Sequence, residues 1–285
     1  MTIKPNIAIV GANSILSQSL IERLRLDYKI HQVVHLSEDK IKNKKNIIKI
    51  DDFLQSDIQF DVIYFISSVI NFEESIEAIQ EIFNTNVMLL LKISNKFQSA
   101  KIIHTSSISV FQSQNSVINE LSQLAPKSSY ALSKLWAEQV VENHPGGGVN
   151  LRLSSLYGEQ MNLNTFLPII IKQGILDKKI TVFGDGSRKQ NYISVDEASE
   201  YLYKAIGFSN KIPLLAVANE SFSNYEVSQV IQNIMTDISI DFVGHDESNS
   251  YVFNNKITKE KLQINSNYSF SEKIGELIKW MQKQY

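Results

Sequence analysis

The sequence predicts an α/β fold built on a doubly wound parallel sheet, because short apolar strands alternate with amphipathic helices. The expected strands are rich in β-branched residues and span residues 7–10, 32–36, 47–50, 62–66, 101–104 and 149–153. One expected helix carries Leu16, Leu20 and Leu24 on one face, and two others span residues 75–97 and 130–142. Nearly continuous apolar strands separated by helices indicate a parallel sheet covered on both faces.

The alternation becomes less regular after about residue 156, so we expect two closely joined domains. Residues 1–155 are expected to form the doubly wound domain, with a return segment at about residues 191–218, and residues 156–285 to form a smaller α/β part. The spacing of Ile274, Leu277, Ile278 and Met281 predicts a closing amphipathic helix.

The composition excludes several classes of function. A net charge of -2 gives no general attraction to nucleic acid or to anionic membranes, and no apolar run approaches about 18 residues. The chain has no cysteine, which excludes disulfides, thiolate nucleophiles and thiolate metal sites and fits a cytoplasmic protein. Its five histidines lack the spacing of a metal site, so we expect no metal.

The first strand, turn and helix read Ile7-Ala8-Ile9-Val10-Gly11-Ala12-Asn13-Ser14-Ile15-Leu16-Ser17. In a Rossmann-type fold this turn binds a dinucleotide pyrophosphate through backbone amides and the helix N-terminus. The residues expected to line the phosphates are Gly11, Asn13, Ser14, Ile15 and Leu16. Ser14 and Ser17 stand where the usual pattern has its second and third glycines, and their added Cβ atoms are expected to push the cofactor outward and loosen it.

The end of the second strand is expected to select the cofactor. Ser37 aligns with the acidic residue that binds the ribose 2'-hydroxyl of NAD, and a small hydroxyl there tolerates the 2'-phosphate of NADP, which favours NADP. A slip of one residue would bring Glu38 into this position and favour NAD instead. Asp51 and Asp52 are expected at a turn beside the adenine, although they also suit the start of a helix.

Tyr130 and Lys134 are four residues apart, so on a helix both side chains reach one site. An ammonium group and an oxidised nicotinamide both favour the phenolate, which brings the Tyr130 pKa from about 10 towards working pH. Tyr130 is therefore a candidate acid or base. The serine-rich run at residues 104–110 lies just upstream.

The ordered motifs resemble those of the extended short-chain dehydrogenase/reductases of the nucleotide-sugar epimerase/dehydratase family. The resemblance rests on Ser67-Ser68, Asn86, residues 105–111, Glu120, Pro126 and Ser129-Tyr130-Ala131-Leu132-Ser133-Lys134, and it continues at residues 152–158, 182–187 and 195–197. It implies that Ser67, Ser68 and Asn86 lie on the nicotinamide side and that Lys134 binds the nicotinamide ribose. It further implies that Ser107 orients a substrate oxygen whose proton Tyr130 exchanges.

The expected substrate part departs from the family pattern. Gln190 occupies the position where many members carry a phosphate-binding arginine, and Ser155 replaces the usual asparagine. Arg188 is then the candidate for the substrate diphosphate, because a guanidinium grips phosphate oxygens bidentately. The nucleotide base and the sugar are not readable from these residues.

Three functions follow from the resemblance. Ile108 and Ser109 follow Ser107 where a 4,6-dehydratase carries an acidic pair, which disfavours dehydration. The serine-containing loop and Ser37 both favour a cofactor that exchanges, so the main expectation is NADPH-dependent reduction of a nucleotide-activated keto sugar. The first alternative is an epimerase that keeps its NAD, and the second is a cofactor-sensing protein without catalysis.

The resemblance also implies a homodimer formed by the helix at residues 75–97 and the helix that begins at Tyr130. Apolar side chains on these helices either form that interface or only cover the sheet: Leu89, Leu90, Ile93, Leu135, Trp136 and Val140.

Overall fold

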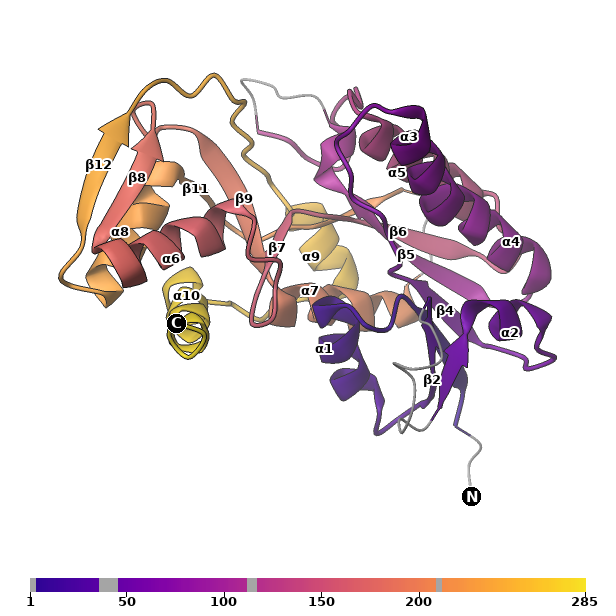
Figure 1. Ribbon diagram of the computed structural model, residues 1–285. Helices are drawn as coiled ribbons and strands as arrows, with labels where there is room; N and C mark the ends of the chain where they lie inside the picture. Colours follow the sequence, from indigo (N-terminus) through magenta and orange to yellow (C-terminus); the bar gives the residue numbers. More distant parts are fainter. Residues whose placement is uncertain (1–3, 36–45, 112–116, 209–211) are drawn as a thin grey trace.

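The computed structural model describes residues 4–35, 46–111, 117–208 and 212–285 (Figure 1). Its centre is a seven-stranded sheet in which every pair of neighbours is parallel. The order is β10 (Leu214–Ala216), β6 (Gly148–Leu153), β5 (Lys101–Ser107), β4 (Val62–Phe65), β1 (Asn6–Val10), β2 (Lys29–Val34) and β3 (Ile47–Lys49). This order confirms the predicted fold class. The edge strand β10, which pairs with β6, lies within residues 191–218, where the return segment was expected.

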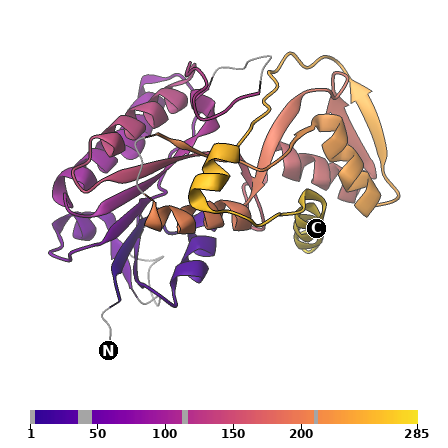
Figure 2. The same ribbon diagram turned by 180° about the vertical axis from the view of Figure 1, so that it is seen from behind.

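Helices cover both faces of this sheet (Figures 1 and 2). One face carries α1 (Ile15–Leu24), α7 (Val195–Lys204) and α9 (Lys256–Leu262), and the other carries α2 (Ile50–Gln55), α3 (Ile76–Phe83), α4 (Leu89–Lys96) and α5 (Ser129–Glu142). In β1, Ile7 and Ile9 enter the first core while Ala8 and Val10 enter the second. Burial of successive side chains on opposite faces explains why the strand is apolar throughout.

The predicted helix at residues 75–97 contains one π-helical turn, Asn84–Met88, between α3 and α4. The amide of Leu89 donates to the carbonyl of Asn84, which is the i to i−5 bond of that turn. Leu89, Leu90 and Ile93 are buried in the core beneath α4. Of the two alternatives for these three residues, the structure therefore supports covering the sheet.

The C-terminal part forms a second layer of smaller sheets. The first joins β11 (Ser221–Ser223), β9 (Lys189–Ser194) and β7 (Ser155–Tyr157), and the second joins β12 (Ser239–Val243) and β8 (Lys179–Phe183). Helices α6 (Phe166–Asp177), α8 (Asn224–Ile234) and α10 (Phe270–Gln282) pack around one apolar core. The predicted stripe Ile274, Leu277, Ile278 and Met281 faces that core.

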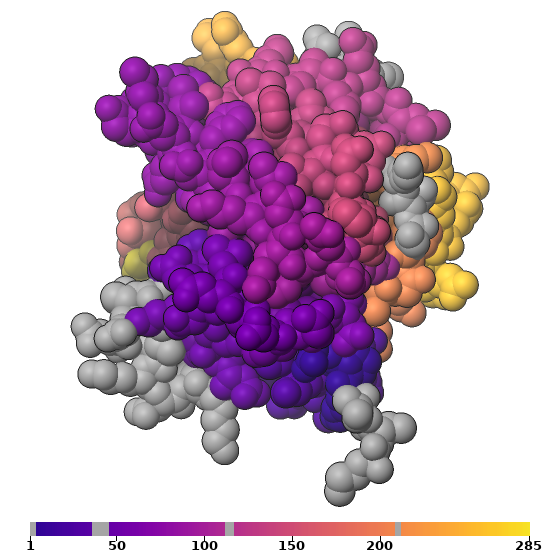
Figure 3. Space-filling view, turned by 90° about the vertical axis from the view of Figure 1, so that its right-hand side faces the viewer, coloured from indigo at the N-terminus to yellow at the C-terminus, as the bar shows by residue number. Residues whose placement is uncertain are grey.

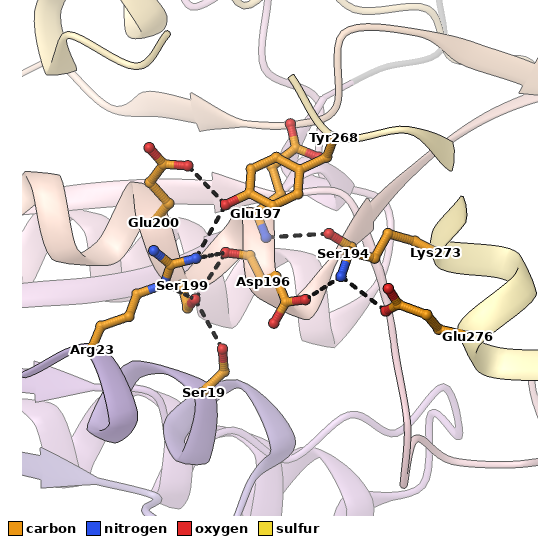
Figure 4. Close-up of polar contacts among 10 residues, drawn as sticks. All are labelled: Ser19, Arg23, Ser194, Asp196, Glu197, Ser199, Glu200, Tyr268, Lys273 and Glu276. Carbon is orange, nitrogen blue, oxygen red and sulfur yellow. Dashed lines mark hydrogen bonds and ion pairs between the residues drawn. The ribbon is translucent and has the colours of Figure 1, made fainter. Parts of the chain in front are cut away.

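A polar network joins α1 to α7 and to the segment before α10 (Figure 4). The Arg23 guanidinium donates to Ser199 Oγ at 2.7 Å, to the Asp196 carbonyl at 2.9 Å and to the Tyr268 hydroxyl at 3.1 Å. Lys273 of α10 contacts the Asp196 carboxylate at 2.6 Å. The two parts of the chain are therefore tied together at α7.

Figure 3 views the molecule from the side of the N-terminal half, which forms most of that face. In the part of the chain that the structure describes, no helix combines the length and the apolar character needed to span a membrane.

Candidate active site

The carboxyl ends of β1, β4 and β5 bring most of the predicted site residues to one edge of the sheet. β4 and β2 lie on opposite sides of β1, so the chain order reverses there, and in open parallel sheets ligands bind at such a point. Gly11 follows β1, Ser67 and Ser68 follow β4, and β5 ends at Ser107.

Gly11 is required by close packing of the first turn. Its φ is +88°, and a Cβ added there would lie 2.5 Å from the Ser67 nitrogen and 2.7 Å from its Cα. The Gly11 amide donates to the Val33 carbonyl at 3.0 Å. The turn is therefore held against β2 and the end of β4, as a Rossmann-type pyrophosphate loop requires.

Ser14 and Ser17 hydrogen-bond to each other and to the turn itself. Ser17 is fully buried, and its hydroxyl donates to the Gly11 carbonyl at 2.8 Å. The two serine oxygens are 2.8 Å apart, and since the Ser17 proton is already donated to Gly11, the Ser14 hydroxyl is the donor between them. Ser14 Oγ also accepts the Ser17 amide at 3.1 Å.

This arrangement differs from the expectation that both serines loosen the cofactor. Because the Ser17 hydroxyl is bound inside the turn, it closes the loop in place of a glycine. Ser14 caps α1, and its proton is not free to reach a phosphate. The amides of Ile15 and Leu16, in the first turn of α1, have no intrahelical acceptor and so remain available to an anion.

Tyr130 lies at the start of α5, buried to 8% exposure. Burial raises the pKa of its phenol, and the hydroxyls of Ser107 and Ser68 act in the opposite direction. Ser107 Oγ accepts the Ser109 amide at 3.1 Å, and Ser68 Oγ is buried without a hydrogen bond of normal length. A buried hydroxyl without a partner at the sheet edge indicates a place for a ligand's polar atom.

Lys134 is one turn further along α5 and only 2% exposed. Its ammonium donates to the Thr105 carbonyl at 2.9 Å and lies 5.8 Å from the centroid of the Tyr130 ring. Burial lowers the Lys134 pKa to about 7, while the carboxylate of Glu138 opposes this shift. The structure thus brings Ser107, Tyr130 and Lys134 together as predicted, and their catalytic roles stay predictions.

A buried ion pair between Glu138 and Arg152 holds α5 against the sheet, and the sequence analysis did not identify it. Glu138 accepts two bonds from the Arg152 guanidinium, at 2.9 and 2.7 Å, and one from the Ser106 hydroxyl at 2.6 Å. Both charged side chains are 3% exposed. The pair joins α5 to β5 and β6 directly behind Ser107. Glu138 lies one turn after Lys134, so helical spacing was the signal that could have revealed it.

Asn86, in the π-helical turn, binds the backbone rather than an open site. Its side-chain oxygen accepts the Val69 amide at 2.8 Å, and its nitrogen donates to the Val69 carbonyl at 3.1 Å and to Ser133 Oγ at 3.0 Å. Asn86 is fully buried. It therefore fixes the segment after Ser68 relative to α5, and its cofactor-binding role stays a prediction.

His35 is a further residue at this edge that the sequence analysis missed. It follows β2, and its Nε2 lies 3.2 Å from Ser67 Oγ. Burial lowers the His35 pKa, and Asp51 acts in the opposite direction. Asp51 and Asp52 are exposed in the first turn of α2, close enough for Asp51 to affect His35. Ser37 lies outside the described residues, so its cofactor role stays a prediction.

Of the predicted substrate residues, Ser107 ends β5 in the large sheet, whereas Ser155 and Gln190 lie on the three-stranded sheet and Arg188 directly precedes β9. Ser155 is exposed on β7 and pairs in register with Tyr192 of β9. The Arg188 side chain donates to the Asn249 carbonyl at 3.3 Å, and Gln190 donates to Asn224 Oδ1 at 3.4 Å. The Arg188 guanidinium also interacts electrostatically with the Asp246 carboxylate, so part of its charge is offset within the chain.

A cavity of about 270 Å³ separates the first turn from the C-terminal part. Its lining includes Asn13 and Ile15 from the turn, Gly158 after β7, and Lys273 from α10. The tight Gly11 turn, the open amides of α1 and the unpartnered Ser68 hydroxyl fit a nicotinamide dinucleotide. In the described part of the chain, no cluster of three or more histidine, aspartate or glutamate side chains is arranged to hold a metal.

Comparisons with known proteins agree with this geometry. Among curated proteins, the chain is similar to an uncharacterized UDP-glucose epimerase of Bacillus subtilis, with 22% identity over 237 residues that cover 70% of this chain and 72% of the relative. A solved UDP-N-acetylglucosamine 4-epimerase from Methanobrevibacter ruminantium, in complex with UDP-N-acetylmuramic acid, has a TM-score of 0.85 at 18% identity and covers 100% of both chains.

The UDP-glucuronic acid 4-epimerase from Bacillus cereus, solved with UDP-glucuronic acid and NAD, has a TM-score of 0.83 at 18% identity and covers 98% of this chain and 100% of its own. At this identity the two solved structures show a shared fold. Residues 7–214 match the model of the NAD dependent epimerase/dehydratase family, which is most of the chain and includes the whole edge described above. The chain belongs to the NAD dependent epimerase/dehydratase family.

Proposed function

We propose that this protein is a nucleotide-sugar 4-epimerase that keeps its NAD bound through the reaction. The observation that carries the proposal is the buried Tyr130 phenol between the Ser107 and Ser68 hydroxyls, beside Lys134 and at the edge where the Gly11 turn fits a dinucleotide. Two relatives that are 22% identical are named as UDP-glucose epimerases, one uncharacterized and one putative, which supports UDP-hexoses as substrates.

The residues of the chain account for the proton transfers of such a reaction. Tyr130 takes the proton of the sugar C4 hydroxyl as that carbon is oxidised, and returns it when the carbonyl is reduced on its other face. Ser107 Oγ already accepts the Ser109 amide, so its proton is free to donate to the reacting oxygen. NAD held at the Gly11 turn would supply the acceptor for the C4 hydride and its donor on return, and the positive charge of its oxidised ring would favour the Tyr130 phenolate.

This proposal replaces the reductase as the main expectation. The reductase depended on two supports, a loosened pyrophosphate loop and Ser37. The closed hydrogen bonds of Ser14 and Ser17 now argue for a tight loop, which suits a cofactor that stays bound. Both curated relatives are named as UDP-glucose epimerases, whereas the solved structures include 4-epimerases and a dTDP-glucose 4,6-dehydratase and support the fold alone. A reductase would instead consume one reduced cofactor for each keto sugar.

The test of the proposed function is conversion of UDP-glucose to UDP-galactose, and of UDP-N-acetylglucosamine to its C4 epimer, by the purified protein without added cofactor. We expect Tyr130→Phe to lose at least about a hundredfold in rate while keeping nucleotide affinity. The matched control is Tyr203→Phe in α7, which should keep full activity. Consumption of NADPH with a nucleotide-activated keto sugar, and no epimerisation, would establish the reductase. Cofactor binding that is the same in wild type and Tyr130→Phe, with no conversion of any sugar nucleotide by either protein, would favour the cofactor-sensing alternative.

The choice between NAD and NADP is a separate question. The UDP-glucuronic acid 4-epimerase was solved with NAD, whereas Ser37 favours NADP. We expect Ser37→Asp to weaken NADP binding by at least about tenfold through charge repulsion, with a smaller gain for NAD. Calorimetric titration of both proteins with both cofactors measures this. Unchanged NADP affinity would mean that Ser37 does not face the 2' position.

We also propose a homodimer formed through α4 and α5. Trp136 is 61% exposed, and Leu132, Met88 and Leu91 are further exposed apolar side chains on α5 and on the turn and helix beside it. Leu135 and Val140, named in the sequence analysis, instead pack partly against the core. An exposed apolar surface of this kind suits a self-complementary interface.

A further inference from the structure

The loop between β4 and α3, residues 66–75, is fixed at two points. Near its start, Asn86 holds both backbone groups of Val69. Near its end, the Glu74 carboxylate accepts the Ser129 hydroxyl at 2.6 Å and the Ser129 amide at 3.2 Å, which ties it to the first turn of α5. The segment between these anchors is therefore held beside Tyr130, the next residue after Ser129.

Phe72 lies between the two anchors and is 72% exposed. Its ring centroid is 6.2 Å from that of Tyr130, with an interplanar angle of 70°. Tyr130 is itself buried, whereas most of the Phe72 surface stays exposed beside it. Ile70 in the same segment is also exposed, at 63%.

An apolar surface beside the reacting group has a clear use in sugar recognition. A hexopyranose ring presents its C–H bonds to aromatic faces and its hydroxyls to polar groups at the sides, so an open phenyl ring can pack against it. The charge of the loop adds a second constraint. Residues 66–75 carry Glu73 and Glu74 and no lysine, arginine or histidine. Both carboxylates repel an anionic sugar substituent.

We propose that Phe72 contacts the sugar ring of the substrate, and that this loop selects uncharged hexoses over uronic acids. The inference rests on the proposed function for the identity of the substrate. It adds a specificity-determining residue and a substrate class. It also separates this protein from the structural relative that was solved with UDP-glucuronic acid, although the two folds are the same.

The experiment compares binding of UDP, UDP-glucose and UDP-glucuronic acid to the NAD-supplemented protein by calorimetry. UDP lacks the sugar, so it separates sugar contacts from nucleotide contacts. We expect wild type to bind UDP-glucose at least about tenfold more tightly than UDP-glucuronic acid. Phe72→Ala should weaken UDP-glucose binding at least about fivefold and leave UDP and NADH affinity unchanged.

Two further variants sharpen the test. Leu26→Ala removes a side chain of similar exposure, 75%, after α1 and should change nothing. Phe72→Arg supplies a bidentate partner for a carboxylate and should bring the two sugar nucleotides to similar affinity. The proposal is overturned if Phe72→Ala weakens UDP as much as UDP-glucose, if it has no effect, or if wild type binds UDP-glucuronic acid as tightly as UDP-glucose.

These outcomes are separate from failure of the proposed function. If wild type epimerises no UDP-hexose but the three binding differences are observed, the sugar contact holds and the 4-epimerase assignment fails. If epimerisation is observed and Phe72→Ala leaves UDP-glucose affinity unchanged, the assignment holds and the role of Phe72 fails.

Discussion

Replacing Glu138 with glutamine tests how far the buried ion pair supports the site. The substitution keeps the shape of the side chain but leaves the Arg152 guanidinium, 3% exposed, without a counter-charge. Removing one partner of a buried ion pair lowers the free energy of unfolding by about 3–5 kcal/mol, because the remaining charge stays buried. In a chain of this size that corresponds to a fall in melting temperature of roughly 10 °C.

The structure offers a matched control for this measurement. The Lys179–Asp241 pair has an N···O distance of 2.5 Å, similar to that of Arg152–Glu138, but its side chains are 48% and 46% exposed. Asp241→Asn should cost less than about 1 kcal/mol, since exposed pairs contribute little. Replacing both buried partners, Glu138→Met with Arg152→Met, should recover much of the loss because neither partner is left as an unpaired charge.

The assay is urea denaturation followed by circular dichroism, with activity measured in parallel across pH. Loss of Glu138 also removes the negative charge that opposes the lowering of the Lys134 pKa, so that pKa should fall further below about 7. If Glu138→Gln destabilises the protein no more than Asp241→Asn, burial does not set the strength of this pair and the reasoning is refuted.

Three further predictions concern Lys134, Ser17 and Trp136. Lys134 has a pKa of about 7 in the folded chain and 10.5 as its ordinary value, so its burial costs stability fully below pH 7, and the cost fades as the pH rises towards 10.5. Lys134→Met should therefore raise the free energy of unfolding by at least about 2 kcal/mol at pH 6.5 and by little at pH 10. Urea titrations at both pH values measure this, and an equal gain at the two pH values would contradict it. Ser17→Gly should weaken NAD binding about fivefold through loss of the two hydrogen bonds that Ser17 Oγ makes inside the turn. Tighter binding in calorimetry would restore the view that the serine obstructs the cofactor. Trp136→Glu should convert a dimer into a monomer in light scattering, and a monomeric wild type at micromolar concentration would remove the interface.

Much of the fold could be predicted because the strands and helices are locally periodic. The apolar run from Ile7 to Val10 predicted a buried strand, and in the structure its side chains are buried on both faces of the sheet. The π-helical turn at Asn84–Met88 could not be predicted. Asn86 in this turn binds the Val69 backbone, which is close in space but 17 residues away in the sequence, so local periodicity does not reveal the contact.

The position of the predicted site residues in the fold could be predicted, but the hydrogen bonds that they make could not. The sheet edge that collects Gly11, Ser68, Ser107 and Tyr130 follows from strand order alone. Whether the Ser17 hydroxyl points to a phosphate or to the Gly11 carbonyl depends on a rotamer, which spacing does not specify. His35 was missed because its partner, Ser67, follows a different strand.

The contacts of Arg23 have a practical consequence for work with this protein. Through Arg23, α1 shares Asp196 and Tyr268 with the last segment of the chain, and Lys273 binds the same aspartate. Asp196 and Lys273 also line the cavity beside Asn13 and Ile15, so we expect docking of the C-terminal helix and binding of a ligand at the start of α1 to be coupled. By thermodynamic linkage each strengthens the other. An affinity tag or truncation near Tyr285 that loosens α10 would then be read as a change in cofactor affinity, so a cofactor constant is best measured on the untagged chain.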